Sequence, residues 1–372
     1  MSNSKALFSR PASAYYLILG SVVALSALGL VMVLSASSVK ALNESGNSFA
    51  YVLRQGLFLI ISVAIAWVAM KLRAELWKPI ARTALLASCV LLILPQIPGI
   101  GKTVGGNTNW IGIGSFTIQP SEFAKIGIIL WCALRLRIHD MKASQGEESN
   151  AAKLIVPGIV VVMGLILLGH DLGTAVVVAG IVGGTLFISG IPMRVVGTLS
   201  AIIGVAFAAL ILTSSNRMNR FSAFFNPFAE ANYKGVGWQQ AHSIMGLASG
   251  GPLGTGLGSS KQKWGNLPEA HTDFIFSVIG EELGLLGTLA VLALFALLIL
   301  GIFRVALRAD NSFDRYVCAG IGCCAAPGLC PVAGHHHGTS QAIEHITNCK
   351  FGCDGHGQYV DRSSECADDQ PG

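Results

Sequence analysis

Acidic residues at the ends of long apolar segments are the strongest candidates for chemistry in this chain. Asp273 follows a loop and opens the apolar run Phe274–Val278, so we expect it at the boundary between water and an apolar medium. Partial desolvation at such a boundary raises the pKa of a carboxyl group toward the range of a useful general base. Asp also commonly caps the first turn of a helix, and the residues alone favour neither role over the other.

A second candidate is the oppositely charged pair Glu122 and Lys125. Pro120 followed by Ser121 is typical of a helix start, and a separation of three residues places the two charges on one face of that helix. Charged side chains inside an otherwise apolar helix are expensive and usually functional. The alternative is a structural ion pair that orients this helix among its neighbours.

Other polar and aromatic positions suit either structure or function. Asp171 precedes an apolar segment, where it either caps the next helix or faces a cavity. Glu281 and Glu282 form a second acidic pair, whose structural role would be to end or bend the segment near Gly284. Composition alone makes Trp110 an anchor in an interfacial aromatic belt.

Several common catalytic motifs do not occur in the sequence. The glycine-rich segment Ser249–Gly258 has no Gly-Lys-Ser/Thr and no flanking strand pattern, which excludes a nucleotide-binding loop. The chain contains no Gly-x-Ser-x-Gly elbow, no His-Glu-x-x-His motif and no Ser-His-Asp order. The hydrolase classes built on those motifs are therefore excluded.

The elements that must position these residues follow from the composition. Only 12% of the 372 residues are charged and 52% are hydrophobic, whereas soluble domains are about 25% charged. A soluble fold of this size and intrinsic disorder of most of the chain are both excluded. The apolar runs are long and continuous, unlike the short alternating strands of a membrane β-barrel. We therefore predict an all-α polytopic membrane protein.

A helix needs about 20 mostly apolar residues to cross a bilayer, and we predict eight transmembrane helices. Their apolar cores are Tyr16–Ser37, Gly56–Met70, Thr83–Leu94, Ser121–Leu134, Leu154–Leu168, Thr174–Ser189, Val195–Thr213 and Leu285–Phe303. Among short connecting segments, fourteen Lys and Arg fall on one side and three on the other. The positive-inside rule then places the N-terminus in the cytoplasm and residues 95–120 and 214–284 in outer loops. This topology explains the net charge of +5 without nucleic acid as a partner.

The composition changes abruptly after the eighth span. Seven of the 9 Cys and five of the 9 His lie after Val317, where no apolar span occurs. Their spacing does not match a zinc site, and the segment lacks the charge or Ser/Pro content of an ordinary disordered tail. We expect a cytoplasmic N-terminus over residues 1–15 and a membrane domain over 16–316. Residues 317–372 then form an aberrant, disordered tail of the kind that a shifted reading frame produces.

Four motifs together resemble the SEDS family (shape, elongation, division and sporulation). They are Gln119-Pro120-Ser121-Glu122 with Lys125, Asp171-Leu172-Gly173-Thr174-Ala175, Gly250-Gly251 to Gly258, and Pro268–Phe274 through Glu281–Gly284. The order, spacing and predicted loop sides agree with the family from Tyr16 to Cys323. Pro268-Glu269-Ala270-His271 is most similar to the division members of the family.

This resemblance implies an activity. SEDS proteins polymerise lipid II, an undecaprenyl-diphosphate-linked disaccharide peptide, into glycan strands on the outer face of the bacterial plasma membrane. The implied partners are a class B penicillin-binding protein, which cross-links the strands, and other divisome membrane proteins at the septum. A lipid II flippase and a non-catalytic divisome scaffold are the alternatives, since charges inside a membrane also mark transport pathways.

The resemblance also implies roles for particular residues. The family's essential Asp matches Asp273, which would take the proton from the acceptor sugar hydroxyl. The family's essential Trp matches Trp110, and its acid and base on the fourth helix match Glu122 and Lys125.

The remaining expected site residues serve the substrate. The departing diphosphate requires positive charge, for which Lys125, Arg217 and Arg220 are candidates. A divalent cation, Mg²⁺ or Mn²⁺, is left open as a further aid. His271 and Glu281, from the family motifs, complete the expected substrate-binding set.

The sequence departs from the family pattern in three places. Asn109 stands where members usually carry Arg before the Trp, and Gly169-His170 replaces Gln-Pro before Asp171. The family has ten spans, whereas eight are predicted here. Cys318–Cys323 resembles the start of the ninth span, and a frameshift near Cys323–Cys324 would explain both the missing helices and the tail.

Overall fold

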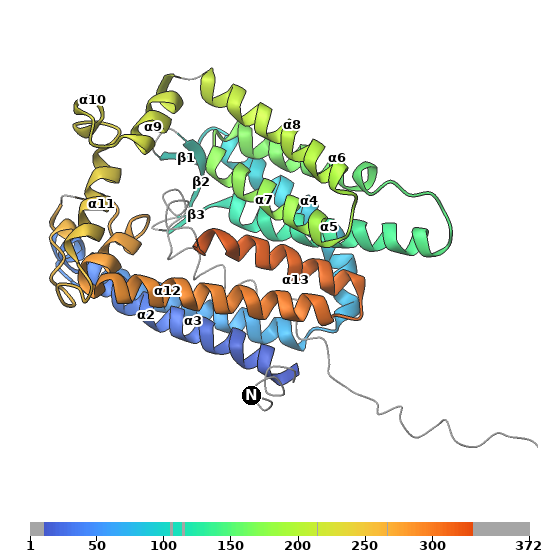
Figure 1. The fold of residues 1–372 in the computed structure, drawn as a ribbon, viewed down its shortest axis with the longest axis horizontal. Coiled ribbons are helices and arrows are strands. Elements are labelled where there is room, and N and C mark those ends of the chain that lie inside the picture. The colour runs from blue at the N-terminus through green and yellow to red at the C-terminus, as the bar shows by residue number, and fades with distance from the viewer. Residues whose placement is uncertain (1–10, 105–106, 114–115, 214, 266, 330–372) are drawn as a thin grey trace, which may run out of the picture.

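The computed structural model describes residues 11–104, 107–113, 116–213, 215–265 and 267–329, and this part of the chain is mostly helical (Figure 1). The long helices are α2 (Pro11–Ser45), α3 (Ala50–Lys71), α4 (Trp77–Ile93), α5 (Pro120–Ser144), α6 (Ala151–Leu168), α7 (Leu172–Ile188), α8 (Met193–Leu212) and α12 (Ile275–Arg308). Shorter helices are α9 (Ser215–Phe225), α10 (Glu230–Tyr233), α11 (Trp238–Ser249) and α13 (Ser312–Ala325), with 3-10 turns η1 (Ala74–Leu76), η2 (Leu94–Gln96), η3 (Gln262–Trp264) and η4 (Ala326–Leu329). Most of the predicted tail, residues 330–372, lies outside the described residues.

Each predicted apolar segment falls on a helix, to within one residue at its ends. Within the described part of the chain, six helices are long and apolar enough to cross a membrane, namely α2, α3, α4, α6, α8 and α12. Helix α7 has only 17 residues, and α5 carries several ionisable side chains. The fold is therefore that of a helical, multi-pass membrane protein, while the count of eight spans stays a prediction.

The expectation of an all-α fold needs one correction. A three-stranded antiparallel sheet in the order β1-β2-β3 follows η2, with strands β1 (Gly101–Val104), β2 (Asn107–Ile113) and β3 (Phe116–Ile118). These short segments are rich in Thr, Val, Ile, Trp and Phe, which favour strands, and they connect two helices. The sheet and α9–α11 lie at the same end of the helix bundle, at the left in Figure 1.

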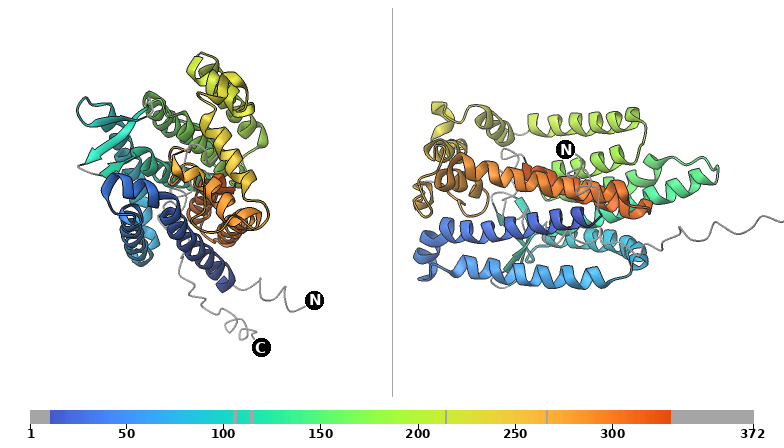
Figure 2. Two further views of the ribbon diagram at one scale, coloured as in Figure 1. Left: turned by 90° about the vertical axis from the view of Figure 1, so that its left-hand side faces the viewer. Right: turned by 60° about the horizontal axis from the view of Figure 1, so that its bottom comes forward.

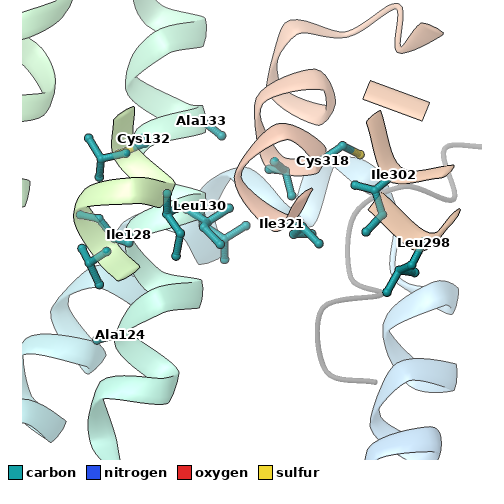
Figure 3. Close-up of a cluster of buried hydrophobic side chains, with 14 of the residues drawn as sticks. Ala124, Ile128, Leu130, Cys132, Ala133, Leu298, Ile302, Cys318 and Ile321 are labelled. Carbon is teal, nitrogen blue, oxygen red and sulfur yellow. The ribbon is translucent and has the colours of Figure 1, made fainter. Parts of the chain in front are cut away.

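The core of the bundle is built around α5, which packs against α4, α6, α7 and α13. Its residues Ala124, Ile128 and Ala133 are fully buried, and Cys318 of α13 is equally inaccessible. Figure 3 shows this cluster with side chains from α5, α12 and α13. The predicted domain boundary between residues 316 and 317 thus falls inside α13, whose second half contributes to the core.

Helix α2 lies between α12 and α3 along the bundle and packs against both (Figures 1 and 2). Helix α12 is interrupted at Gly284, whose φ of 70° and ψ of −164° are not helical. The amides that follow the break are satisfied by the glycine-rich loop, since Leu285 N donates to Gly251 O at 2.9 Å. A Cβ on Gly284 would collide with the backbone of Gly254, so the close approach requires glycine. The expected bend near Gly284 is confirmed.

Candidate functional site

Asp273 lies in the turn that leads from the long loop between α8 and α12 into α12. Phe274 occupies the N-cap position of α12 and makes no side-chain cap hydrogen bond. Asp273 therefore does not cap this helix, and the capping alternative is wrong. The Asp273 carboxylate is half-buried, and within the described part of the chain it has no hydrogen-bond or ion-pair partner.

The environment of Asp273 makes its carboxylate more basic than an exposed one. Burial and the negative charge of Glu269 raise the pKa of Asp273 to about 6, compared with about 3.9 for an unperturbed Asp. The carboxylate is therefore ionised at neutral pH and yet suited to accept a proton, because a base works best when its pKa lies near the working pH.

Two helices contact the turn that carries Asp273. Lys40 of α2 forms an ion pair with Glu269, with 3.1 Å between Nζ and Oε1. The ring of Tyr51, at the start of α3, meets the ring of His271 edge to face, with 4.7 Å between centroids. His271 is buried, and its Nε2 lies 4.0 Å from Oε2 of Glu269. The structure thus brings His271, an expected site residue, into the surroundings of Asp273.

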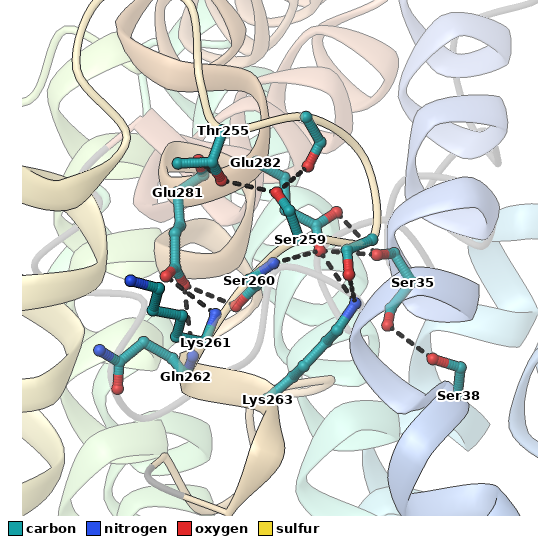
Figure 4. A network of polar contacts seen from close by, with 12 residues as sticks. Ser35, Ser38, Thr255, Ser259, Ser260, Lys261, Gln262, Lys263, Glu281 and Glu282 are labelled. Atoms are coloured by element: carbon teal, nitrogen blue, oxygen red, sulfur yellow. Dashed lines mark hydrogen bonds and ion pairs between the residues drawn. The ribbon is translucent and has the colours of Figure 1, made fainter.

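Glu281 holds in place the loop that follows the glycine-rich segment Ser249–Gly258. Its carboxylate, only 2% exposed, accepts hydrogen bonds from Ser260 Oγ at 2.6 Å, Lys261 N at 2.9 Å and Gln262 N at 3.4 Å (Figure 4). A carboxylate with three protein donors and almost no exposed surface is well placed to fix a loop. The expected role of Glu281 in substrate binding stays a prediction.

Glu282 connects the same loop to α2. Its two carboxylate oxygens share the single hydroxyl proton of Ser35, with Oγ at 2.8 and 2.7 Å, and the carboxylate pairs with Lys263 Nζ at 3.3 Å. Lys263 also donates to the carbonyl of Gly258 at 2.6 Å. Both side chains of this ion pair are buried, so the charge of each is compensated by the other within the protein.

A second polar group surrounds Asp171, on other elements. Asp171 caps α7, because its Oδ1 accepts from Thr174 N at 3.0 Å, and the predicted cap is confirmed. Its Oδ2 accepts from Asn109 Nδ2 at 2.7 Å and from Gln119 Nε2 at 3.1 Å. Asn109, which departs from the family pattern, therefore joins β2 to α7.

Glu122 and Lys125 form the expected ion pair near the start of α5, with 2.8 Å between Nζ and Oε2. The Lys125 side chain is 4% exposed, so its positive charge is held inside the bundle. The shared helix face is confirmed, whereas a catalytic or binding role for the pair stays a prediction.

The other expected site residues lie on β2 and α9. Trp110 is half-buried on β2, opposite Lys102 of β1. Arg220 is exposed on α9. Arg217 belongs to the same helix, but its side chain lies outside the described residues. The described contacts do not bring either arginine to Asp273.

Lys40, Tyr51 and Lys263 are not predicted from the sequence. Lys40 contacts Glu269 across 229 positions of the chain and Lys263 contacts Glu282 across 19, and no local pattern reports such contacts. The sequence does give one sign of Lys40: it is one of the few Lys or Arg residues in the short segments predicted to lie on the outer side of the membrane.

The described residues do not form a cluster of the kind that would hold a divalent cation. They contain no group of three or more His, Cys, Asp or Glu side chains placed to hold a metal ion.

Comparisons with known proteins agree on one family. Residues 15–330 match the family model described as "Cell cycle protein", which covers FtsW, RodA and SpoVE. The chain is 39% identical over 305 residues to a probable peptidoglycan glycosyltransferase FtsW of Trichlorobacter lovleyi, covering 81% of this chain and 78% of that relative. A probable peptidoglycan glycosyltransferase FtsW of Coxiella burnetii is 37% identical over 294 residues, covering 79% and 78%.

Two solved structures share the fold. A chain from a peptidoglycan synthase complex, solved to explain the coordination of polymerization and crosslinking, superposes with a TM-score of 0.68 at 23% identity, covering 89% of this chain and 94% of that one. The rod shape determining protein RodA of Thermus thermophilus superposes with a TM-score of 0.62 at 22% identity, covering 91% and 95%.

Proposed function

The chain belongs to the FtsW/RodA/SpoVE family, and from this premise we propose that it is a peptidoglycan glycosyltransferase of the FtsW type. Its reaction is the polymerisation of lipid II into glycan strands during cell division. The observation that carries the assignment of the site is the half-buried Asp273 carboxylate, whose pKa is raised to about 6 by burial and by Glu269.

In the proposed reaction, Asp273 is the general base. Its carboxylate takes the proton from a hydroxyl of the acceptor sugar while the hydroxyl oxygen forms a bond to C1 of the donor sugar. The bond between C1 and the phosphate oxygen breaks, and the lipid diphosphate leaves with the electron pair. The carboxylate then releases its proton to water, which returns the site to its starting state.

Charge compensation of the diphosphate is the second requirement of the reaction. We propose Arg217 and Arg220 on α9 for this role, and the exposure of Arg220 supports it. Lys125 already has a partner in Glu122, so its proposed contribution is a positive potential within the bundle. Trp110 is proposed as a substrate contact on β2.

The proposed setting is the inner membrane at the division septum, with the site on its outer face. A multi-pass membrane location follows from the family and from the apolar helices. A class B penicillin-binding protein is the proposed partner, supported by the likeness to a chain of a peptidoglycan synthase complex. Other divisome membrane proteins are proposed neighbours, and no feature of the chain calls for nucleic acid.

Purified protein incubated with labelled lipid II tests the proposal. Asp273→Asn removes the base while preserving the size of the side chain, and polymerisation should fall by about 10²–10⁴-fold. Asp310→Asn is the matched control, because Asp310 is an exposed carboxylate beyond the opposite end of α12. Polymerisation by Asp273→Asn at the parental rate would refute Asp273 as the base and direct attention to Glu122, Glu281 and Glu282. Transport of lipid II across the membrane of vesicles that contain the protein, without polymer formation, would instead identify a flippase.

A further inference from the structure

We propose that Lys40 and Glu269 are positioning residues for Asp273, which clamp the turn that carries it to helix α2 and set the charge beside its carboxylate. The inference rests on the proposed function, because it takes Asp273 as the base. It concerns a contact between residues 229 positions apart, which neither the sequence motifs nor the family comparison assigns.

Glu269 organises the backbone on both sides of Asp273. Its carbonyl oxygen accepts from Thr272 N at 3.2 Å and from Phe274 N at 3.3 Å. The residues immediately before and after Asp273 are therefore bonded to one oxygen atom. The backbone at Glu269 has a φ of 54°, in the left-handed region that a non-glycine residue rarely occupies. Such a conformation persists only where surrounding contacts hold it.

The Glu269 carboxylate provides those contacts. Its Oε2 accepts from Thr272 Oγ1 at 3.1 Å, inside the turn, and its Oε1 pairs with Lys40 Nζ at 3.1 Å, outside it. One carboxylate thus joins the turn to α2. The Lys40 and Glu269 side chains are 36% and 49% exposed, and ion pairs this accessible contribute little to stability. The effects of the pair are therefore on the orientation of the turn and on the charge beside Asp273.

The charges around the turn give the pair an electrostatic consequence. Glu269 raises the pKa of Asp273, and Lys40 offsets that negative charge. His271 faces Glu269 as well, but burial and Lys40 lower the pKa of the imidazole, so the ring is neutral near pH 7. Helices α2 and α3 add Glu44, which acts on His271 and Tyr51, and Arg54, which acts on Tyr51. Near pH 7, therefore, Lys40 and not His271 is the positive charge that compensates Glu269.

Substituting the two partners one at a time should move the pH profile in opposite directions. Glu269→Gln removes a negative charge beside Asp273, so the acid limb of kcat/KM should move to lower pH. Lys40→Met leaves Glu269 uncompensated, so the limb should move to higher pH. Each displacement should be about half a unit to one unit, given the size of nearby-charge effects. A loosened turn should also lower kcat, on the order of tenfold.

The measurement uses the full-length protein with labelled lipid II between pH 5 and 8. Lys40→Arg keeps the charge and should restore the parental profile. The matched controls are Lys142→Met and Glu147→Gln, because these residues form an exposed ion pair between the last turn of α5 and the segment that follows it, with side chains 47% and 58% exposed. Neither control should move the limb or lower the rate.

Three outcomes would overturn the proposal: unchanged profiles in both variants, displacements in the same direction, or equal losses of rate without displacement. If a single variant fails to accumulate in membranes, Lys40→Met/Glu269→Gln is measured instead. This uncharged pair should show a limb between those expected for the two single variants and a reduced kcat, and a parental kcat would contradict the clamp. An active Asp273→Asn would refute the proposed function itself, whereas an inactive Asp273→Asn with parental pair variants would refute the clamp alone.

Discussion

Ser35 in α2 shares its single hydroxyl proton between the two carboxylate oxygens of Glu282 in α12, 247 positions later in the chain, at 2.7 and 2.8 Å. The same carboxylate pairs with Lys263 of the preceding loop. Three segments of the protein, a first helix, a long loop and a late helix, therefore meet at one buried charge. Removing that charge should weaken the contacts of all three segments.

We predict that Glu282→Ala destabilises the protein severely. Lys263 would keep a buried charge without its carboxylate partner, and breaking a buried ion pair from one side costs about 3–5 kcal/mol. Thermal unfolding in detergent measures the effect. Lys263→Met/Glu282→Gln, which removes both charges, should recover a large part of the loss. A Glu282→Ala protein as stable as the parent would show that the pair contributes nothing.

The pH dependence of polymerisation should report Asp273. Its pKa is raised to about 6 by burial and by Glu269, and the base acts only when deprotonated. The value of kcat/KM should therefore be constant above pH 7 and fall about tenfold per unit well below pH 6. A profile that stays flat from pH 7 down to pH 4.5 would exclude this carboxylate as the base.

Asp171→Asn should weaken the junction between β2 and α7. Asn caps helices nearly as well as Asp, so the cap at Thr174 survives. The side-chain amide of the new residue, however, would bring a donor toward the donors of Asn109 and Gln119, which now meet a carboxylate oxygen. An unsatisfied buried group costs about 1–3 kcal/mol, measurable by chemical denaturation. Asp171→Ala, which also loses the cap, should be worse, and equal stability of all three proteins would contradict this reading.

The predicted topology has a direct test with reporter fusions. Gln145, at the end of α5, lies on the Lys- and Arg-rich side of the chain, whereas Lys261 lies in the long loop before α12. By the positive-inside rule, a reporter after Gln145 should be cytoplasmic and one after Lys261 external. The reverse pair of results would place Asp273 in the wrong compartment for lipid II polymerisation.

The features predicted from the sequence are those that depend on neighbours along the chain. The helix positions, the cap at Asp171 and the pairing of Glu122 with Lys125 follow from spacings of three residues or from apolar runs, and the structure confirms them. The capping role of Asp273 is wrong because α12 begins only at Ile275. Single-sequence boundaries are uncertain by more than that margin.

The features that escaped prediction depend on distant parts of the chain. The contact of Lys40 with Glu269 exists because α2 runs beside α12, which packing decides. The small sheet before α5 escaped because its strands are short and lie between strongly apolar helices. Composition over such short segments distinguishes strand from irregular loop poorly.

The break at Gly284 divides α12 into two parts, and each part makes its own hydrogen bonds to the preceding loop. Thr255 N and Gly256 N donate to the carbonyls of Glu281 and Glu282, while Leu285 N donates to the loop at Gly251. These amides can lose protection only when the loop and the helix separate. In native-state hydrogen exchange they should open together as one cooperative unit, distinct from the rest of α12. The residues on both sides of the break are thus coupled, in their dynamics, to the loop that precedes the helix.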